Sequence, residues 1–516
     1  MVEPMSGVSM RVVDFFDRAA RQHAGRMCLV DEERGWTFRQ VQARTASLAR
    51  TFGSDASGPR LKIGILAPNC ADAVIAILAV FRAGCVWVPA NSRATAEELA
   101  TFLALVECDL LLVHQSLMEL GRAAVRGSRC RLLDLPRAED LAEEAVGDED
   151  ALPYAPEDVC SVFGTGGTTG SPKAALWSHR TWSTLIANFH AGIRHDGPPV
   201  HLVAAPFTHA AGVISMPLMA IGATTVLVPR AEPELVMRTI AQHRVTTLFL
   251  PPTVIYTLLA HPDVRRYDYG SLQNFIYAAA PMSVDKLKEA MEVFGPVMVQ
   301  TFGQAEAPMV CTILGRHEHL EALQGDRPER LASCGRPGLL TELAVLDDDG
   351  GPLPGGETGE IAVRGDLVMA GYMNNPEATA ASRVGGWHLT GDIGRVDDDG
   401  FVYITDRKRD MIISGGFNVF PSEIEQLLWS HPAVRDCAVI GCPDPKWGEA
   451  VVAVVELKPD ADCDEATLIA LCKSRLGSVK SPKRIEFWRE LPRSSVGKVL
   501  KRAVRDRFWA GRERRI

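Results

Sequence analysis

Short apolar runs rich in β-branched residues alternate with helical patterns through roughly the first two thirds of this 516-residue chain. Strand-like runs occupy 61–66, 85–89, 159–163, 225–228 and 246–250, and helical patterns occupy 71–82 and 232–243. Runs that are apolar at every position are typical of strands buried on both faces. The pattern therefore predicts an α/β fold with parallel sheets covered by helices.

The pattern of residues along the chain changes after about residue 335. Glycine and proline punctuate short strand-like runs at 342–346 and 359–364, which predicts a small antiparallel, β-barrel-like subdomain. Two acidic stretches, 347–350 and 397–400, each end in glycine between such runs. We interpret them as hairpin turns, because a calcium loop starting at Asp347 requires glutamate where this chain has Thr358.

A charged linker at 406–410 precedes a final segment with its own alternation of elements. Helices are expected at 421–429 and 465–476, and strands at 437–440, 450–457 and 484–488. A chain of this length exceeds one hydrophobic core. We therefore expect a large N-terminal domain at 1–406, a hinge at 407–410 and a smaller mobile α+β domain at 411–516.

Composition excludes several classes of protein. A net charge of −9 argues against nucleic acid as a partner, because phosphate backbones require a basic surface. The apolar stretches at 73–81 and 210–229 are too short or too interrupted for a membrane span, and no secretory leader is visible. The 12 cysteines show no Cys-x-x-Cys pair, which indicates free thiols and a cytoplasmic location.

A glycine-rich loop follows the strand-like run at 159–163 and reads Gly164-Thr165-Gly166-Gly167-Thr168-Thr169-Gly170-Ser171-Pro172-Lys173. Its glycines let the backbone approach a ligand, and its hydroxyls and lysine suit a polyphosphate. The loop is not a Walker A motif, because Gly170 is not followed by lysine. It therefore predicts a nucleotide site of another kind.

Three further segments carry groups that suit a nucleotide. Phe302, Gly303, Gln304 and Glu306 combine an aromatic ring for a purine with a carboxylate that would hold Mg²⁺ beside phosphates. The segment 387–392 ends in a carboxylate suited to a ribose diol, and 492–498 presents a lysine after a glycine, suited to a transferring phosphoryl group.

Together these motifs, in this order, resemble the adenylate-forming (AMP-binding) superfamily and, within it, the acyl-CoA synthetases and aryl-CoA ligases. The resemblance spans nearly the whole chain and assigns roles to residues. Catalysis falls to Lys498, Thr165, Glu306 and His209, with Glu306 and Thr165 holding Mg²⁺ and Arg409 at the hinge. The implied ATP site comprises Thr165, Gly166, Gly167, Thr168, Thr169, Gly170, Lys173, Ala279, Ala280, Phe302, Gly303, Gln304, Asp392, Arg407 and Lys498.

The resemblance also implies a two-step reaction. A small-molecule carboxylic acid attacks ATP to give acyl-AMP and pyrophosphate, and a thiol then attacks the acyl carbonyl after the small domain rotates. Coenzyme A is the expected acceptor, because Gly415, Gly416 and Trp447 resemble positions that face its tunnel. The assembly state stays open, and a homodimer is one alternative.

The acyl pocket implied by the resemblance is apolar. It would be lined by His209, Ala279, Gly303 and Met309, which suits a fatty or aromatic acid. The segment 206–212 lacks the aspartate that amino-acid-activating relatives place near this position, which argues against an amino acid.

One departure from the family pattern bears on the rate. Ala305 stands where the family usually has a threonine whose hydroxyl contacts the AMP phosphate, and the loss would cost about 1.5–3 kcal/mol. A neighbouring hydroxyl such as Thr301 or Thr168 is a candidate substitute. This departure leaves a weakly active nucleotide-binding homologue as one alternative. A second alternative, independent of Ala305, is an acyl-AMP ligase that loads a carrier protein instead of coenzyme A.

Overall fold

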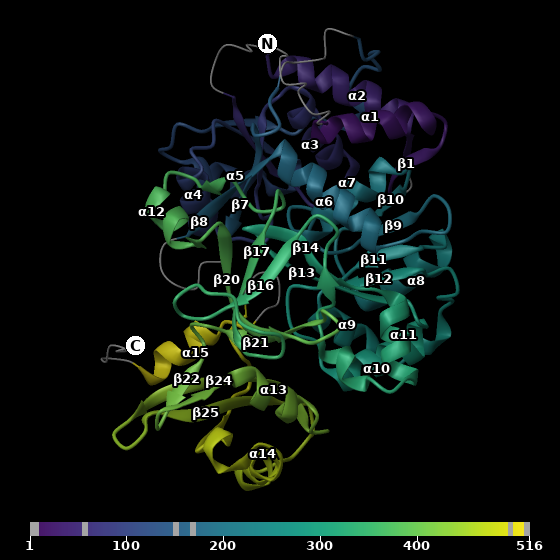
Figure 1. Ribbon diagram of the computed structural model, residues 1–516. Coiled ribbons are helices and arrows are strands. Elements are labelled where there is room, and N and C mark those ends of the chain that lie inside the picture. The colour runs from purple at the N-terminus through teal and green to yellow at the C-terminus, as the bar shows by residue number, and fades with distance from the viewer. Residues whose placement is uncertain are drawn as a thin grey trace.

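The computed structural model describes residues 10–32, 34–53, 60–147, 154–165, 172–493 and 499–509. Within these residues the strands form four sheets, of nine, seven, five and five strands. Figure 1 shows the C-terminal sheet and its helices, in olive and yellow, gathered at one end of the molecule. The predicted α/β class is confirmed.

The largest sheet is parallel in its centre and antiparallel at both edges. β2 pairs antiparallel with β1, and β14 pairs antiparallel with β13 and β15. The predicted parallel sheet is thus its centre, and antiparallel strands extend it at both edges. The strand order is β15 (Arg336–Pro337), β14 (Ala307–Leu314), β13 (Met298–Gln304), β12 (Asn274–Tyr277), β11 (Thr247–Phe249), β9 (Val200–Val203), β10 (Thr224–Leu227), β1 (Met27–Asp31) and β2 (Arg34–Thr37).

The second large sheet is also parallel for most of its width, but it has antiparallel strands at one edge only. Its parallel strands are continued at one edge by antiparallel β8 and β18. The strand order is β18 (Gly371–Tyr372), β8 (Lys173–Ser178), β7 (Val159–Thr165), β4 (Val86–Pro89), β3 (Lys62–Leu66), β5 (Leu110–Val113) and β6 (Arg131–Asp134).

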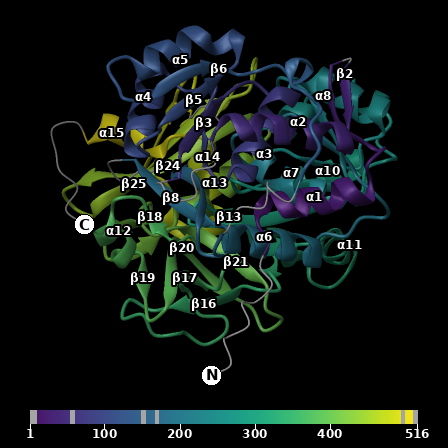
Figure 2. The same cartoon turned by 90° about the horizontal axis from the view of Figure 1, so that it is seen from above.

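Helices cover both large sheets and also lie between them (Figure 2). The layer between the sheets packs against both and contains α1 (Val12–Gln22), α2 (Phe38–Thr51), α3 (Ala71–Arg82), α6 (His179–Gly192) and α7 (Ala210–Ala220). Every residue of α3 is buried, as its continuous apolar sequence predicts. The outer layers are α4 (Ala96–Leu105) and α5 (Met118–Val125) on one side, and α8 (Pro233–His243), α9 (Pro252–Leu259), α10 (Val284–Phe294) and α11 (Arg316–Gln324) on the other.

The predicted small β subdomain is an antiparallel sheet. Strands β16 (Glu342–Leu346), β17 (Gly359–Arg364), β20 (Trp387–Val396) and β19 (Arg383–Val384) lie in that order, with β21 (Val402–Arg407) paired to β20. The stretch at 397–400 forms the turn between β20 and β21, where the amide of Gly400 donates to the carbonyl of Asp397 at 2.9 Å. The hairpin interpretation of that acidic stretch is confirmed. The short helix α12 (Pro376–Ala381) precedes β19.

The C-terminal segment has its own sheet and core. Its strands are β23 (Phe417–Val419), β22 (Ile412–Ser414), β25 (Gly448–Leu457), β24 (Val434–Asp444) and β26 (Arg484–Phe487). Helices α13 (Pro421–Trp429), α14 (Glu465–Lys480) and α15 (Lys501–Phe508) pack on it. Its apolar clusters contain only residues from 412 onward, which agrees with a separately cored unit at this end of the chain.

The structure bears on the expectations for membrane spans and for the cysteines. Among them, no helix combines the length and the apolar character that crossing a membrane would require. All of the cysteines are free thiols, and they are buried except for the partly exposed Cys130 and Cys463.

One buried histidine gives a testable pH dependence. His201 is fully buried, its ring lies within hydrogen-bond distance of Thr247 O and Ser215 Oγ, both at 3.2 Å, and burial lowers its pKa to about 4. An unfolded histidine has a pKa of about 6.5, so between these values unfolding takes up a proton. The stability contributed by the neutral ring is present above pH 6.5 and is lost as the pH falls toward 4.

We therefore expect the free energy of unfolding to fall more steeply between pH 7 and pH 5 in the unaltered protein than in a His201→Asn variant. The difference in slope should approach about 1.4 kcal/mol per pH unit well below pH 6.5. Urea unfolding at several pH values measures it. Parallel pH profiles for the two proteins would contradict this account of His201.

Candidate functional site

A mostly apolar cavity of about 320 Å³ lies where three of the motifs singled out in the sequence meet. The end of β7, the start of α7 and the β13–β14 hairpin each contribute to its wall, and α4 closes the other side. This volume is typical of sites for small organic ligands. The lining residues are Pro89, Asn91, Ala94, Glu98, Leu99, Phe102, Phe163, Gly164, Trp177, Thr208, His209, Ala210, Val213, Gly303, Gln304, Ala305, Pro308 and Met309.

His209 stands at the N-terminal end of α7 and lines the cavity. Its Nδ1 lies 3.0 Å from the hydroxyl oxygen of Thr208. Burial lowers the pKa of His209 to about 4, and the nearby charge of Arg93 acts in the same direction. The imidazole is therefore neutral at physiological pH, so it offers the cavity a polar group without a charge.

The β13–β14 hairpin brings Gly303 and Met309 to the same cavity. A Cβ on Gly303 would lie 2.3 Å from the amide nitrogen of Met309, so the close approach of the strands requires glycine. Met309 itself has a left-handed backbone with a φ of 57°. Such conformations in residues other than glycine are uncommon and cluster at ligand sites.

Gln304 supplies an unpaired donor at this wall. Its Nε2 atom is buried and finds no hydrogen-bond partner among the described residues. A buried amide donor without a partner costs about 1–3 kcal/mol. A ligand oxygen in the cavity would satisfy it.

Glu306 lies in the turn of the hairpin and is buried. The hydroxyl of Tyr372 donates to Glu306 Oε1 at 2.7 Å, and Lys173 Nζ lies 4.8 Å from the centre of the Tyr372 ring. Burial and the Glu306 carboxylate both raise the pKa of Tyr372, so its phenol stays protonated and donates. The structure thus links the lysine of the glycine-rich loop to the carboxylate of a distant motif through Tyr372.

The glycine-rich loop leaves from β7 and returns on β8, and the cross-strand pair at its base is Thr165 and Lys173. Gly166, Gly167, Thr168, Thr169, Gly170 and Lys498 lie outside the described residues. Ala279 and Ala280 lie just beyond Ala278, which follows β12, and Ala279 has a left-handed φ of 72°. Ala279 is not among the residues that line the cavity, and neither is Phe302.

Asp392 and Arg407 face one another on neighbouring strands. They are cross-strand partners of β20 and β21, and Arg407 Nε lies 2.7 Å from Asp392 Oδ1. Asp392 is almost fully buried, and a buried carboxylate is retained where it is paired. The two residues predicted for the ribose therefore form one ion pair.

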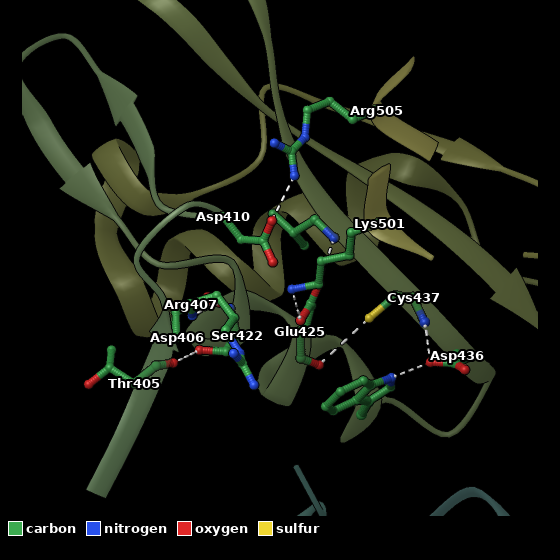
Figure 3. Close-up of polar contacts among 12 residues, drawn as sticks. Thr405, Asp406, Arg407, Asp410, Ser422, Glu425, Asp436, Cys437, Lys501 and Arg505 are labelled. Carbon is green, nitrogen blue, oxygen red and sulfur yellow. Dashed lines mark hydrogen bonds and ion pairs between the residues drawn. The ribbon is translucent and has the colours of Figure 1, made fainter. Parts of the chain in front are cut away.

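The segment 407–410 is joined to the C-terminal segment by charged contacts (Figure 3). Arg505 of α15 reaches Asp410 at 2.7 Å, and Lys501, at the start of the same helix, pairs with the buried Glu425 of α13 at 2.8 Å within the C-terminal segment. Burial alone would raise the pKa of Asp410, but Lys501, Arg409 and Arg505 hold it below its usual value. Arg409, the predicted hinge residue, is itself partly buried, and burial lowers its pKa.

Gly415, Gly416 and Trp447 meet beside the β22–β23 hairpin. Both glycines form its turn with positive φ, 60° and 83°, as such short turns require. The amide of Gly415 donates to the carbonyl of Trp447 at 2.8 Å, and a Cβ on Gly415 would lie 2.7 Å from the Trp447 ring. Lys446 lies over the same exposed indole, with Nζ 4.6 Å from its centre.

Several contributors to the site were missed from the sequence. Tyr372 carried no signal, because a single tyrosine after a glycine is common. Leu99 and Phe102 of α4 fit an ordinary core pattern. Trp177 had one usable signal, since it lies four residues after Lys173, and this even spacing places both side chains on one face of a strand.

Comparisons with known proteins agree with this geometry. Residues 16–373 match the family of AMP-binding enzymes, and residues 423–498 match the AMP-binding enzyme C-terminal domain. The chain is 40% identical over 390 residues to the medium/long-chain-fatty-acid–CoA ligase FadD8 of Mycobacterium tuberculosis, covering 73% of this chain and 67% of that protein.

It is also 36% identical over 477 residues to the feruloyl-CoA synthase of an Amycolatopsis species, covering 92% of this chain and 94% of the relative. Among solved structures, the amide bond synthetase McbA from Marinactinospora thermotolerans superposes with a TM-score of 0.85 at 31% identity, over 96% of this chain and 100% of that one. The family expected from the motifs is confirmed: the chain belongs to the AMP-binding enzymes.

Proposed function

We propose that this chain is an ATP-dependent acid:CoA ligase. It activates an apolar carboxylic acid, fatty or aromatic, as an acyl-adenylate with release of pyrophosphate, and then forms the acyl-CoA. The observation that carries the proposal is the position of the cavity. Its apolar walls end at the hairpin that bears Glu306 and at Gly164, where the glycine-rich loop begins. An acid in this cavity would therefore lie beside bound phosphates.

In the first step a carboxylate oxygen of the acid attacks the α-phosphorus of ATP, and pyrophosphate leaves. Neutral His209 and the unpaired amide of Gln304 offer polar contacts at the cavity wall. Neither adds a negative charge that would repel the carboxylate. Lys498 would stabilise the charge that develops on the phosphoryl group.

The residues at the turn fit a magnesium ion. Within the described residues, the buried carboxylate of Glu306 forms no ion pair, and a buried carboxylate without a cation is costly. Glu306, with Thr165, would hold Mg²⁺, which would supply charge neutralisation at the phosphates. The Asp392–Arg407 pair is the proposed site for the ribose.

In the second step a thiol attacks the acyl carbonyl, and AMP leaves. We assign the hinge to Arg409 within 407–410, between a domain at 1–406 and one at 411–516. The Gly415–Gly416 turn and Trp447 are the proposed contacts for the pantetheine arm of coenzyme A. Because the two steps need different groups at one site, movement about a hinge would alternate them.

Pyrophosphate release over a panel of acids tests the first step. Since the cavity is apolar, each added methylene should raise kcat/KM about fourfold until the cavity is filled, from about 0.8 kcal/mol per buried methylene. Release should depend on the acid and vanish in Lys498→Ala. Failure of every acid would point to the nucleotide-binding homologue, and unaltered release in Lys498→Ala would remove that lysine from its role.

Product analysis separates the acceptors. We expect acyl-CoA from the acid, ATP and coenzyme A. Acylation of a pantetheinylated carrier protein without any acyl-CoA would favour the carrier-loading alternative. The same assay should include an amine as a further acceptor, because a structural relative is an amide bond synthetase.

Tyr372→Phe tests the link between the loop and the carboxylate. The variant keeps the ring beside Lys173 but removes the hydroxyl bonded to Glu306. Hydrogen bonds to charged groups contribute about 1.5–3 kcal/mol, so the adenylation rate should fall about tenfold or more. Tyr403→Phe is the matched control, because it removes a hydroxyl bonded to Asp397 at 3.0 Å in the small sheet. Equal rates for the two variants would contradict the role of Tyr372.

A further inference from the structure

Trp177 contacts the turn that carries Glu306. Its indole is almost fully buried on β8, and Nε1 donates to the backbone carbonyl of Ala305 at 2.6 Å. Ala305 and Glu306 form the turn between β13 and β14, so the indole bonds to the residue directly before the carboxylate. This contact joins the second large sheet to the first.

Strand β8 approaches the turn directly through Trp177 and indirectly through Lys173 and Tyr372. Lys173 and Trp177 lie four residues apart on β8, and alternation along a strand puts them on one face. Lys173 lies beside the Tyr372 ring, whose hydroxyl bonds to the Glu306 side chain, whereas Trp177 bonds to the backbone at Ala305. One face of β8 therefore bonds to the backbone of the turn through Trp177 and also lies beside the tyrosine that bonds to the Glu306 side chain.

Aromatic packing holds the indole in place. Phe163 stacks on Trp177 with ring centres 3.9 Å apart at 23°, and Trp182 packs edge-on at 5.3 Å and 66°. A side chain locked in this way loses little entropy when it donates a hydrogen bond, so its bond can define the position of the acceptor. Trp182 instead donates to Ser161 Oγ at 2.9 Å, away from the turn.

Trp177, Phe163 and Ala305 also line the apolar cavity. The indole thus forms part of the wall of the proposed acid site and also bonds to the backbone of the turn. Alanine carries no polar side-chain group, so the polar contact of residue 305 with Trp177 is made through its backbone carbonyl.

We propose that Trp177 is a positioning residue, which fixes the Ala305–Glu306 turn from the side of the acid cavity and so sets the geometry for adenylation. The proposal rests on the proposed function for its kinetic consequence. Its structural consequence, a turn held by the indole N–H, does not depend on that function.

The test compares Trp177→Phe with Trp182→Phe. Each removes one indole donor from the same aromatic cluster, but only the first leaves the Ala305 carbonyl without its partner. Hydrogen exchange of the peptide 303–309 should rise about tenfold in Trp177→Phe and remain unchanged in Trp182→Phe, since only the first removes the hydrogen bond that holds the Ala305 carbonyl. In the same comparison, kcat for pyrophosphate release should fall about tenfold in Trp177→Phe, with a smaller change in KM for the acid.

A second replacement at position 177 separates the loss of the N–H donor from the change in side-chain volume. Putting 3-benzothienylalanine at position 177 keeps the bicyclic shape and replaces only the N–H with sulfur. The protein with this analogue should show the same changes in hydrogen exchange and kcat as Trp177→Phe, but it should keep the preference among acids of the unaltered protein. Equal effects of the two phenylalanine variants, or normal exchange and kcat with the sulfur analogue, would overturn the proposal. If no acid supports pyrophosphate release, the proposed function fails, and the exchange comparison still decides whether Trp177 holds the turn.

Discussion

The hydrogen bonds around the β13–β14 turn are the constraint on which the site depends, because they join the two large sheets. The amide of Met369 donates to the carbonyl of Glu306 at 2.8 Å, Tyr372 bonds to its side chain, and Trp177 bonds to Ala305. The segment containing Met369 and Tyr372 also pairs with β8 through β18. Both sheets therefore contribute to one turn, and a shift of either would move Glu306.

The apolar cavity and the segment 407–410 differ in the charges that they carry. The cavity is apolar, and its histidine is kept neutral by burial, which suits an uncharged acyl group. The segment 407–410 and helices α13 and α15 carry paired opposite charges instead, with Lys501 on Glu425 and Arg505 on Asp410. The Arg505–Asp410 pair joins the segment 407–410 to α15, whereas the Lys501–Glu425 pair joins α15 to α13 within the C-terminal segment.

Much of the fold was predictable because local patterns agree with the tertiary structure. The helix at 71–82, the strands at 342–346 and 359–364 and the helix at 421–429 were predicted with the bounds that the structure gives them. The antiparallel edges of the large sheets were not predicted, since a strand's direction depends on its partner. The β13–β14 hairpin was missed for the same reason, although its glycine and carboxylate had been singled out.

The sequence by itself determined the family, the order of the motifs and the chemical types of the groups, because these follow from residue identity and spacing along the chain. Only the tertiary structure decided which groups meet. It joined Lys173 to Glu306 through Tyr372, paired Asp392 with Arg407 and placed Trp177 against Ala305. These contacts connect residues far apart in the chain, and their geometry depends on how the two sheets pack, which no local pattern encodes.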